Sequence, residues 1–374
     1  MTGHVRQRSP GSFELRYRDH GKTRTATFRG TKREADRELR RLLSLVDNNQ
    51  HPSDPDRLTV SGWLSRWLGQ VKGEAAPRTH LRYSEFVRLH ITPQIGDVPL
   101  ARLSVADVQG LYSGLAEKTK LSAQSRKHAA LVLTNALNRA VEQRLIASNP
   151  AQPLKRRLPR VERSDMRFLD QGQSQRLLEF ARPTSLYPAV LTGLATGARR
   201  GEILALKWSR FDLEGRGTVL IAESLEQMGS SIRTKPPKNG KPRTIVLGAA
   251  VIEELRRVKI EQAEALLALG IRQDGETLVC CRADGSMLTP SRLSDGFRAL
   301  ISKSGLPRVR FHDLRHSHAS QLLAAGINIK VVAERLGHAD PAVTLRVYSN
   351  LMPEAQAEAA ARIDTIFRSI VAAQ

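Results

Sequence analysis

The chain has 374 residues and carries 59 Lys or Arg against 37 Asp or Glu, which gives a formal net charge of +22. This excess, spread through every region, predicts an anionic partner, of which nucleic acid is the commonest; an Arg-rich composition that only keeps a protein dissolved is the alternative. No run approaches the roughly 18 apolar residues of a membrane span, so no membrane partner is expected. The only cysteines, Cys280 and Cys281, are adjacent, which excludes a disulfide framework or a metal framework built from them.

The chain length, the first residues and the cysteines also predict the number of domains and the cellular location. A chain of this length is predicted to form two or three domains. The first residues lack the apolar core of a signal peptide, and the cysteine usage suits a reducing environment, so a cytoplasmic location is expected. The expected fold class is α+β and mostly α, with a small N-terminal ββ(β)α module, a helical domain, and a mixed helical domain that contains a small antiparallel sheet.

Residues 1–57 are predicted to contain the ββ(β)α module and a polar linker. Apolar and polar residues alternate around Phe13, as in a half-buried strand, and a second strand is expected over 22–28. Thr31 and Glu34 have the spacing of a capping box at a helix start. A small basic sheet can enter a DNA groove, although a solvated basic surface is the alternative. The candidate DNA-binding residues on the strands are Arg16, Arg18 and Arg24.

Residues 58–150 are predicted to be all helical, with Lys and Arg alternating with apolar positions throughout. Trp63 and Trp67 belong to an apolar stripe that is expected to be core rather than a surface for stacking bases. The last of four helices is expected to begin near Ser125 and to end at Asn149-Pro150.

Residues 151–165 are predicted to be a proline-broken basic linker. Its side chains suit a segment that crosses phosphates; a merely flexible linker is the alternative. The candidates are Lys155, Arg156, Arg157 and Arg160.

Residues 166–374 are expected to form one mixed domain that ends in a helix, with an apolar stripe over 355–370. Arg199 and Glu202 are three residues apart, which usually indicates a surface ion pair, but their apolar neighbours place this pair against a core. Further on, Asn239-Gly240 is a strong signal for a type I′ hairpin turn, and Lys238 lies immediately before it.

The densest group of chemically active side chains runs from residue 310 to residue 348. Its apolar positions predict two helices, which Gly326 separates and Gly337 terminates. The group comprises His312, Arg315, His316, His318, His338 and Tyr348.

Three interpretations compete for this group. The first is a helical core with satisfied histidines. The second is a zinc site, since His312 and His316 are spaced i, i+4; against it, Asp313 stands where a zincin has Glu, and Arg315 would put a fixed positive charge beside the cation. The third is a phosphodiester site, with Arg and His donating to phosphate oxygens and Tyr as nucleophile.

The whole set resembles the tyrosine recombinase (phage integrase) family. The family's first box, Thr-Gly-x-Arg-x-x-Glu, is similar to the segment that holds Arg199 and Glu202. Its second box, His-x-x-Arg, is matched by His312 to Arg315. A Leu-Gly-His segment ending at His338 follows, and Tyr348 comes ten residues later.

The resemblance implies that residues 58–150 are the core-binding, DNA-binding domain of the family, and that the reaction is transesterification of DNA. Tyr348 would attack a scissile phosphate, giving a 3′-phosphotyrosyl link and a free 5′-hydroxyl. Arg199 and Arg315 would clamp the non-bridging oxygens, and Glu202 would hold Arg199. His312 would accept the tyrosine proton, and His338 would hydrogen-bond the phosphate. No metal and no cofactor are implied.

The catalytic lysine is assigned by its position on the family's hairpin. Lys238 fits that position and would protonate the leaving 5′-oxygen; Lys235 and Lys241 are the alternatives.

Within the family, the N-terminal module favours an integrase of a phage or integrative mobile element with an arm-type DNA-binding domain. The implied partners are double-stranded attachment sites and three further copies in a tetramer on DNA, with a directionality factor or a host DNA-bending protein as further candidates. The expected location is the nucleoid of a bacterial host. A type IB topoisomerase-like enzyme and a catalytically silent DNA-binding regulator are the rivals.

Overall fold

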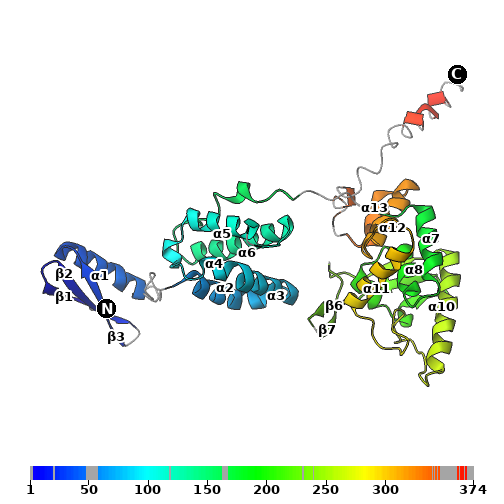
Figure 1. The fold of residues 1–374 in the computed structure, drawn as a ribbon, viewed down its shortest axis with the longest axis horizontal. Helices are drawn as coiled ribbons and strands as arrows, with labels where there is room; N and C mark the ends of the chain where they lie inside the picture. Colours follow the sequence, from blue (N-terminus) through cyan, green and yellow to red (C-terminus); the bar gives the residue numbers. More distant parts are fainter. Residues whose placement is uncertain are drawn as a thin grey trace. The chain divides into compact units, whose positions relative to one another are not determined.

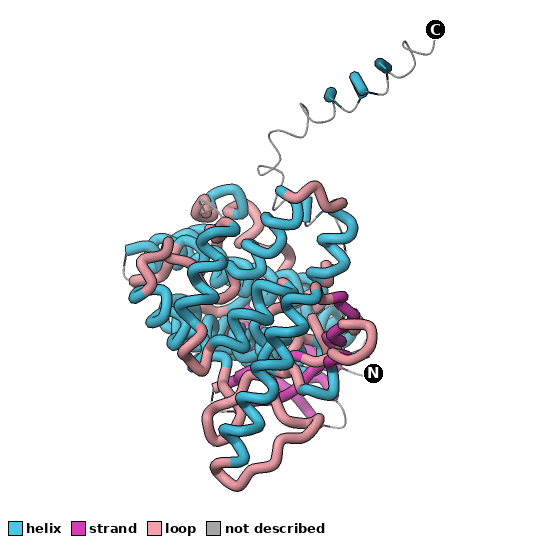
Figure 2. The backbone as a smooth tube through the Cα atoms, turned by 90° about the vertical axis from the view of Figure 1, so that its right-hand side faces the viewer, coloured by secondary structure: helices cyan, strands magenta, loops and turns pink. Residues whose placement is uncertain are grey.

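The computed structural model describes residues 3–19, 22–47, 58–117, 119–161, 167–229, 231–238, 240–338, 340, 342, 344–345, 360–361, 363–365 and 367–368. The chain divides into two compact units, Met1–Arg163 and Ser164–Gln374. Helices make up most of the described backbone, and the strands are few and short (Figures 1 and 2). The predicted α+β, mostly α class is therefore confirmed. In the part of the chain that is described, no helix is long and apolar enough to cross a membrane.

The first unit begins with a three-stranded antiparallel sheet covered on one face by a helix (Figure 1). The strands are β1 (Gly3–Ser9), β2 (Ser12–Asp19) and β3 (Lys22–Arg29), and the helix is α1 (Lys32–Asp47). The third strand, which the sequence left optional, is β1. Phe13, Leu15 and Tyr17 are buried against α1 in a small core of their own. The capping box is confirmed, because Thr31 N donates to Glu34 Oε2 at 2.8 Å.

A second, separate hydrophobic core in this unit belongs to a helical domain. Trp63 and Trp67 are buried in it, and Trp63 Nε1 donates to Ala136 O at 2.9 Å, so the aromatic stripe is core as predicted. The helices are α2 (Val60–Glu74), α3 (Pro77–Phe86), a π-helical turn (Val87–Ile91), α4 (Thr92–Ile95), α5 (Val105–Glu117) and α6 (Ala123–Glu142).

The end of α6 differs from the prediction. The helix stops at Glu142, seven residues before Asn149. Arg144 adopts a left-handed conformation with φ 56°, and Leu145 N donates to Ala140 O at 2.9 Å, so the last turn is closed by its own backbone rather than by a proline.

The segment after Pro150 also begins inside the packed domain. Ala151 and Leu154 are buried in the core of the helices, whereas Lys155–Arg157 form an exposed 3-10 turn. The basic part of the predicted linker therefore starts where the core contacts end.

The second unit is built of helices around one large core with two small sheets. Helix α12 packs against both α8 and α13. The helices are α7 (Gln171–Ala181), α8 (Tyr187–Thr196), α9 (Arg200–Leu204), α10 (Ala249–Leu267), α11 (Pro290–Lys303), α12 (Asp313–Ala324) and α13 (Ile329–Leu336). The strands are β4 (Phe211–Asp212), β5 (Thr218–Ile221), β6 (Ser224–Met228), β7 (Ser231–Lys235) and β8 (Arg243–Val246).

The predicted hairpin at Asn239-Gly240 is wrong. Strand β7 pairs with β6 through a turn that contains Gly229, while β8 pairs with β5 in the other sheet. Pro236, Pro237 and Pro242 explain the difference, because a proline has no N–H with which to continue a ladder between β7 and β8. Lys238 therefore lies in a connection between two sheets, within a turn closed by Gly240 N donating to Pro237 O at 2.8 Å.

Candidate active site

Arg199 sits at the start of a helix whose position is set by a tight turn. Helix α8 ends at Gly197, which has φ 62°, and a Cβ there would lie 2.6 Å from His318 Cδ2. A left-handed backbone and this close approach both require glycine. Arg199 then precedes α9, and its backbone N and its Nη1 donate to the two oxygens of Glu202, each at 2.9 Å. The predicted support of Arg199 by Glu202 has this geometry.

Arg315 reaches the same turn from helix α12. Its side chain is buried, and Nη1 donates to Gly197 O at 2.8 Å. His312 precedes the helix at its N-terminal cap, three residues from Arg315, and its ring meets that of His316 edge to face with centroids 5.6 Å apart. The two signature boxes, more than a hundred residues apart in sequence, therefore meet at Gly197.

His338 follows the end of α13. Gly337 terminates this helix in the left-handed conformation with φ 66°, and Arg199 Nη2 donates to its carbonyl oxygen at 3.3 Å. The next residue, His338, pairs through Nδ1 with Thr344 Oγ1 at 2.7 Å. The structure thus brings Arg199, Arg315 and the turn that carries His338 to one corner of the unit.

The electrostatics of this corner are strongly positive. Desolvation, followed by the charges of His316, Arg315 and Arg199, lowers the pKa of His312 to about 4. Desolvation and the charges of Arg315, Arg199 and Arg243 lower the pKa of His338 to about 4. Both imidazoles are therefore neutral at pH 7, so each ring has one nitrogen that can accept a proton and one that can donate a hydrogen bond.

The three candidate lysines differ in their surroundings. Lys235, on β7, is held by Glu226, with Nζ 2.5 Å from Oε1. Lys238 is exposed in the connection between β7 and β8. Lys241 is also exposed there. The ion pair that holds Lys235 on Glu226 leaves Lys238 and Lys241 as the two exposed candidates.

Arg243 is a member of this corner that sequence reasoning did not single out. Its Nη2 donates to Glu202 Oε2 at 2.6 Å, and its Nε donates to Arg335 O at 2.8 Å. The sequence signal was only that an arginine stands at the start of a predicted strand, and arginines are too frequent in this chain for that signal to select one.

Tyr348, the predicted nucleophile, lies outside the described residues, as do Asn239 and the linker over 48–57. Of the C-terminal apolar stripe, which the sequence predicts over 355–370, Ile363 and Phe367 are described, and they are 53% and 59% exposed.

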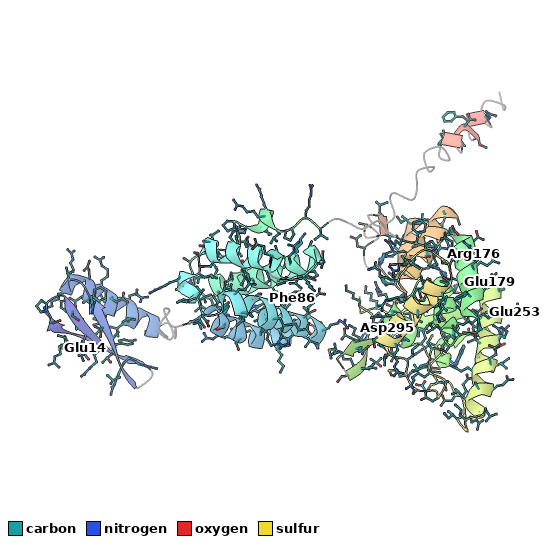
Figure 3. The ribbon with its side chains drawn as sticks, viewed as in Figure 1. Glu14, Phe86, Arg176, Glu179, Glu253 and Asp295 are labelled. Carbon is teal, nitrogen blue, oxygen red and sulfur yellow. The ribbon has the colours of Figure 1, made fainter. Side chains whose placement is uncertain are left out.

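The candidate DNA-binding arginines of the N-terminal sheet fall on two different faces. Arg16 and Arg18 are exposed and alternate with the buried residues of β2, so they lie on the face opposite α1. Arg24 is paired with Tyr17 in the ladder and therefore shares the α1 face. Glu14, labelled in Figure 3, lies two residues before Arg16 on the same strand and is ion-paired with Arg8 at 3.1 Å.

The basic linker candidates Lys155, Arg156, Arg157 and Arg160 are all exposed. Their charge is available to an external anion.

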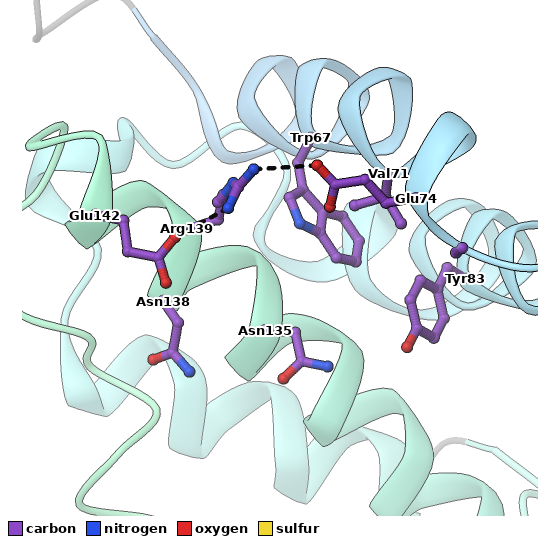
Figure 4. A pocket seen from close by; sticks show the side chains of 9 residues that line it. Trp67, Val71, Glu74, Tyr83, Asn135, Asn138, Arg139 and Glu142 are labelled. Atoms are coloured by element: carbon purple, nitrogen blue, oxygen red, sulfur yellow. Dashed lines mark hydrogen bonds and ion pairs between the residues drawn. The ribbon is translucent and has the colours of Figure 1, made fainter.

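An open pocket lies elsewhere, on the helical domain (Figure 4). Trp67 and Tyr83 stack in it with ring centroids 5.5 Å apart, and Arg139 bridges Glu74 and Glu142, each at 3.2 Å. The pocket contains none of the candidate catalytic residues. In the described parts of the chain there is also no group of three or more His, Cys, Asp or Glu side chains that could hold a metal ion.

Comparison with known proteins identifies the class of the chain. A model of the phage integrase family matches residues 167–354, which is half of the chain, and a model of the phage integrase N-terminal SAM-like domain matches residues 59–116. The chain therefore belongs to the phage integrase family. It is a tyrosine recombinase, an enzyme that exchanges DNA strands by transesterification, and the prediction of this reaction class is confirmed.

Individual relatives agree with this class. The chain is 24% identical over 369 residues to a tyrosine recombinase XerC-like protein of Caldanaerobacter subterraneus subsp. tengcongensis, with 93% of this chain and 94% of the relative covered. It is 26% identical over 313 residues to the ICEBs1 integrase of Bacillus subtilis, with 81% and 82% covered.

Two solved structures share the fold. The Tn1549 transposon integrase in complex with transposon right end DNA has a TM-score of 0.69 at 20% identity, with 82% of this chain and 99% of that chain covered. A lambda integrase tetramer bound to a Holliday junction has a TM-score of 0.57 at 18% identity, with 90% and 96% covered.

Proposed function

We propose that this enzyme integrates and excises a mobile element by cutting and rejoining DNA at specific attachment sites through a 3′-phosphotyrosyl link on Tyr348. The observation that carries the proposal is that Arg315 bonds the carbonyl of Gly197, two residues before Arg199, while Arg199 bonds the carbonyl of Gly337, next to His338. Two guanidiniums held at one corner match the geometry and charge of a phosphodiester.

The two arginines are the proposed clamp on the non-bridging oxygens of the scissile phosphate. Each is fixed by backbone or carboxylate contacts before substrate arrives, so little reorganisation is needed as charge develops in the transition state. The arginine charges would do the work for which other phosphoryl-transfer enzymes use a divalent ion.

The remaining groups would move protons. Tyr348 must lose its proton to attack, and His312, neutral at pH 7, has a nitrogen that can accept it. His338 would donate a hydrogen bond to the phosphate. Lys238 would protonate the departing 5′-oxygen, and the ion pair that holds Lys235 on Glu226 supports this choice over Lys235. The attack forms one phosphate ester as it breaks another, so no external energy source is required.

The DNA contacts are proposed to involve all three predicted domains, 1–57, 58–150 and 166–374. The N-terminal sheet would bind a distant arm site through the face that carries Arg16 and Arg18, and the exposed basic residues of 151–165 would contact phosphates along the core site. The enzyme would work in the cytoplasm of a bacterial host, on nucleoid DNA; its relatives in Bacillus and Caldanaerobacter support a bacterial setting.

We propose a tetramer as the active assembly, since the lambda integrase of similar fold is a tetramer on a Holliday junction. The exposed Ile363 and Phe367 would dock on a neighbouring copy. A directionality factor and a host DNA-bending protein are the proposed accessory partners.

The test uses the attachment sites, which are found as direct repeats that flank the integrated element. Purified enzyme is mixed with two duplexes, one for each site, and with supercoiled plasmid that lacks either site. Joined duplexes with no relaxation of the plasmid support the proposal. Relaxation of the plasmid without joining would instead indicate a topoisomerase.

A further inference from the structure

We propose that Arg243 is a positioning residue for strand cleavage: it sets the orientation of Arg199 through Glu202 and ties the strand that follows Lys238 to the helix that presents His338. This inference rests on the proposed roles of Arg199, Lys238 and His338.

The first contact is with the carboxylate that holds Arg199. Glu202 has a fully buried side chain, and it accepts from Arg199 through one oxygen and from both Arg243 Nη2 and the Arg199 backbone through the other. Burial alone would raise the pKa of Glu202, but the hydrogen bond and charge of Arg243, together with Arg199, keep the pKa below its usual range. Arg243 thus helps keep Glu202 ionised and in place, and an ionised, fixed Glu202 is what orients Arg199.

The second contact is with the helix that ends just before His338. Arg243 Nε donates to Arg335 O at 2.8 Å, and Arg335 Nη1 in return donates to Val246 O at 3.0 Å. Each arginine therefore caps a backbone carbonyl of the other's element, which locks β8 to α13. Because β8 begins five residues after Lys238, the same lock limits where the Lys238 connection can lie.

The third contact is with Gly337, the residue that directly precedes His338. A Cβ on Gly337 would lie 3.0 Å from Arg243 Nη1 and 3.1 Å from Arg243 Cδ. The guanidinium therefore packs directly beneath the turn that aims His338. Its side chain is only 10% exposed, and its Nη1 atom is buried without a hydrogen-bond partner among the described residues. An Arg held this way acts on the site through its neighbours rather than by contact with DNA.

A purely structural role would change stability alone, so the test measures chemistry. Covalent protein–DNA adduct is followed in single turnover on a nicked attachment-site duplex, at a temperature below the melting point of every variant. Arg243→Ala is compared with Arg199→Ala and with the double variant. The matched control is Arg256→Ala, because Arg256 also bridges a carboxylate, Glu214, and a backbone carbonyl, that of Leu213, in the same unit.

Arg243→Ala should slow adduct formation by roughly ten- to a hundredfold at unchanged DNA affinity, as expected for misplacing a transition-state donor. In the Arg199→Ala background, the same change should slow it by no more than about threefold, because residues that act as one unit are non-additive. Arg256→Ala should stay within about twofold of the parent. If Arg243→Ala does not fold, Arg243→Lys is used. Lysine keeps a positive charge beside Glu202 and should retain part of the rate of adduct formation.

Two results would overturn the inference: a rate within twofold of the parent for the Arg243 variant, or a full additional loss in the Arg199→Ala background. Failure of the proposed function is recognised separately, since the parent enzyme itself would then form no covalent adduct on the attachment-site duplex.

Discussion

Arg315 Nη1 donates to the carbonyl oxygen of Gly197 at 2.8 Å. Gly197 is the left-handed residue that ends α8, two positions before Arg199. One hydrogen bond therefore connects the second signature box to the backbone that aims the arginine of the first. The orientation of Arg315 is thus tied to the turn from which Arg199 extends, so two residues far apart in sequence are held close to each other.

Arg199→Ala and Arg315→Ala should each lower strand cleavage by on the order of 10² or more, since each removes a preorganised donor from the transition state. Arg315→Lys should not restore the rate, because a lysine cannot bond Gly197 O and a phosphate with the same planar fork. Adduct yield per unit time on a nicked duplex is the measurement, and EDTA should not change it. Inhibition by EDTA that zinc reverses would contradict this and would support the alternative that His312 and His316 are zinc ligands.

Gly201→Ala should destabilise the second unit by about 1–3 kcal/mol, because the new Cβ would lie 2.5 Å from Leu225 O in β6 and backbone would have to move. It should also slow cleavage, since β6 and β7 lead to the Lys238 connection. Gly110→Ala is the control: a Cβ there meets nothing within 4 Å, and Ala in a helix is neutral or stabilising. The measurement is denaturant unfolding of both variants. If Gly201→Ala is as stable as the parent, the close approach of Gly201 to Leu225 O is refuted.

The stability of the second unit should fall as the pH drops from about 6.5 towards 4. His312, His318 and His338 have their pKa lowered to about 4 in the folded chain, first of all by desolvation. The unfolded chain therefore binds more protons in this window, which favours unfolding. His318→Asn should reduce the slope of melting temperature against pH, since the His318 ring is buried with Nδ1 on Leu194 O at 2.7 Å. An unchanged slope would show that His318 titrates normally.

Much of the site could be predicted from sequence because its residues sit in short, local motifs. The Thr-Gly-x-Arg-x-x-Glu and His-x-x-Arg spacings fix neighbours one helical turn apart, and Gly197 and Gly337 mark helix ends by their backbone freedom alone. The strand alternation around Phe13 was likewise a local signal.

The remainder depends on contacts between distant segments. The prolines beside Asn239-Gly240 disfavour a ladder across that turn, but no local signal identifies β5 as the partner of β8. The same is true of Arg243, whose partners Glu202 and Arg335 lie 41 and 92 residues away, and of the end of α6, which is closed by its own backbone. The sequence shows that a proline or an arginine is present, but the contacts that give the residue its role form only in the folded chain.

The two faces of the N-terminal sheet give a paired test. Changing both Arg16 and Arg18 to Ala should weaken binding to a distant arm site. The slope of log affinity against log salt concentration should become shallower by the equivalent of about two phosphate contacts. Arg24→Ala, on the α1 face, should leave arm binding nearly unchanged. Deleting residues 1–57 should remove the distant footprint but keep cleavage at the core site. A footprint that survives the deletion, or an equal effect of Arg24→Ala, would argue against the open face as the DNA contact.

Tyr348 is the proposed nucleophile, and the proposed reaction requires its side-chain oxygen. Tyr348→Phe removes a single oxygen, so DNA affinity should stay within about twofold while cleavage is abolished. The direct measurement is recovery of the covalent adduct from the parent enzyme on a nicked attachment-site duplex, followed by mapping of the DNA-linked peptide. We expect a 3′-phosphate ester on Tyr348 in the parent and no adduct from Tyr348→Phe. An adduct from the Phe variant, or a link mapped to another residue, would contradict this expectation.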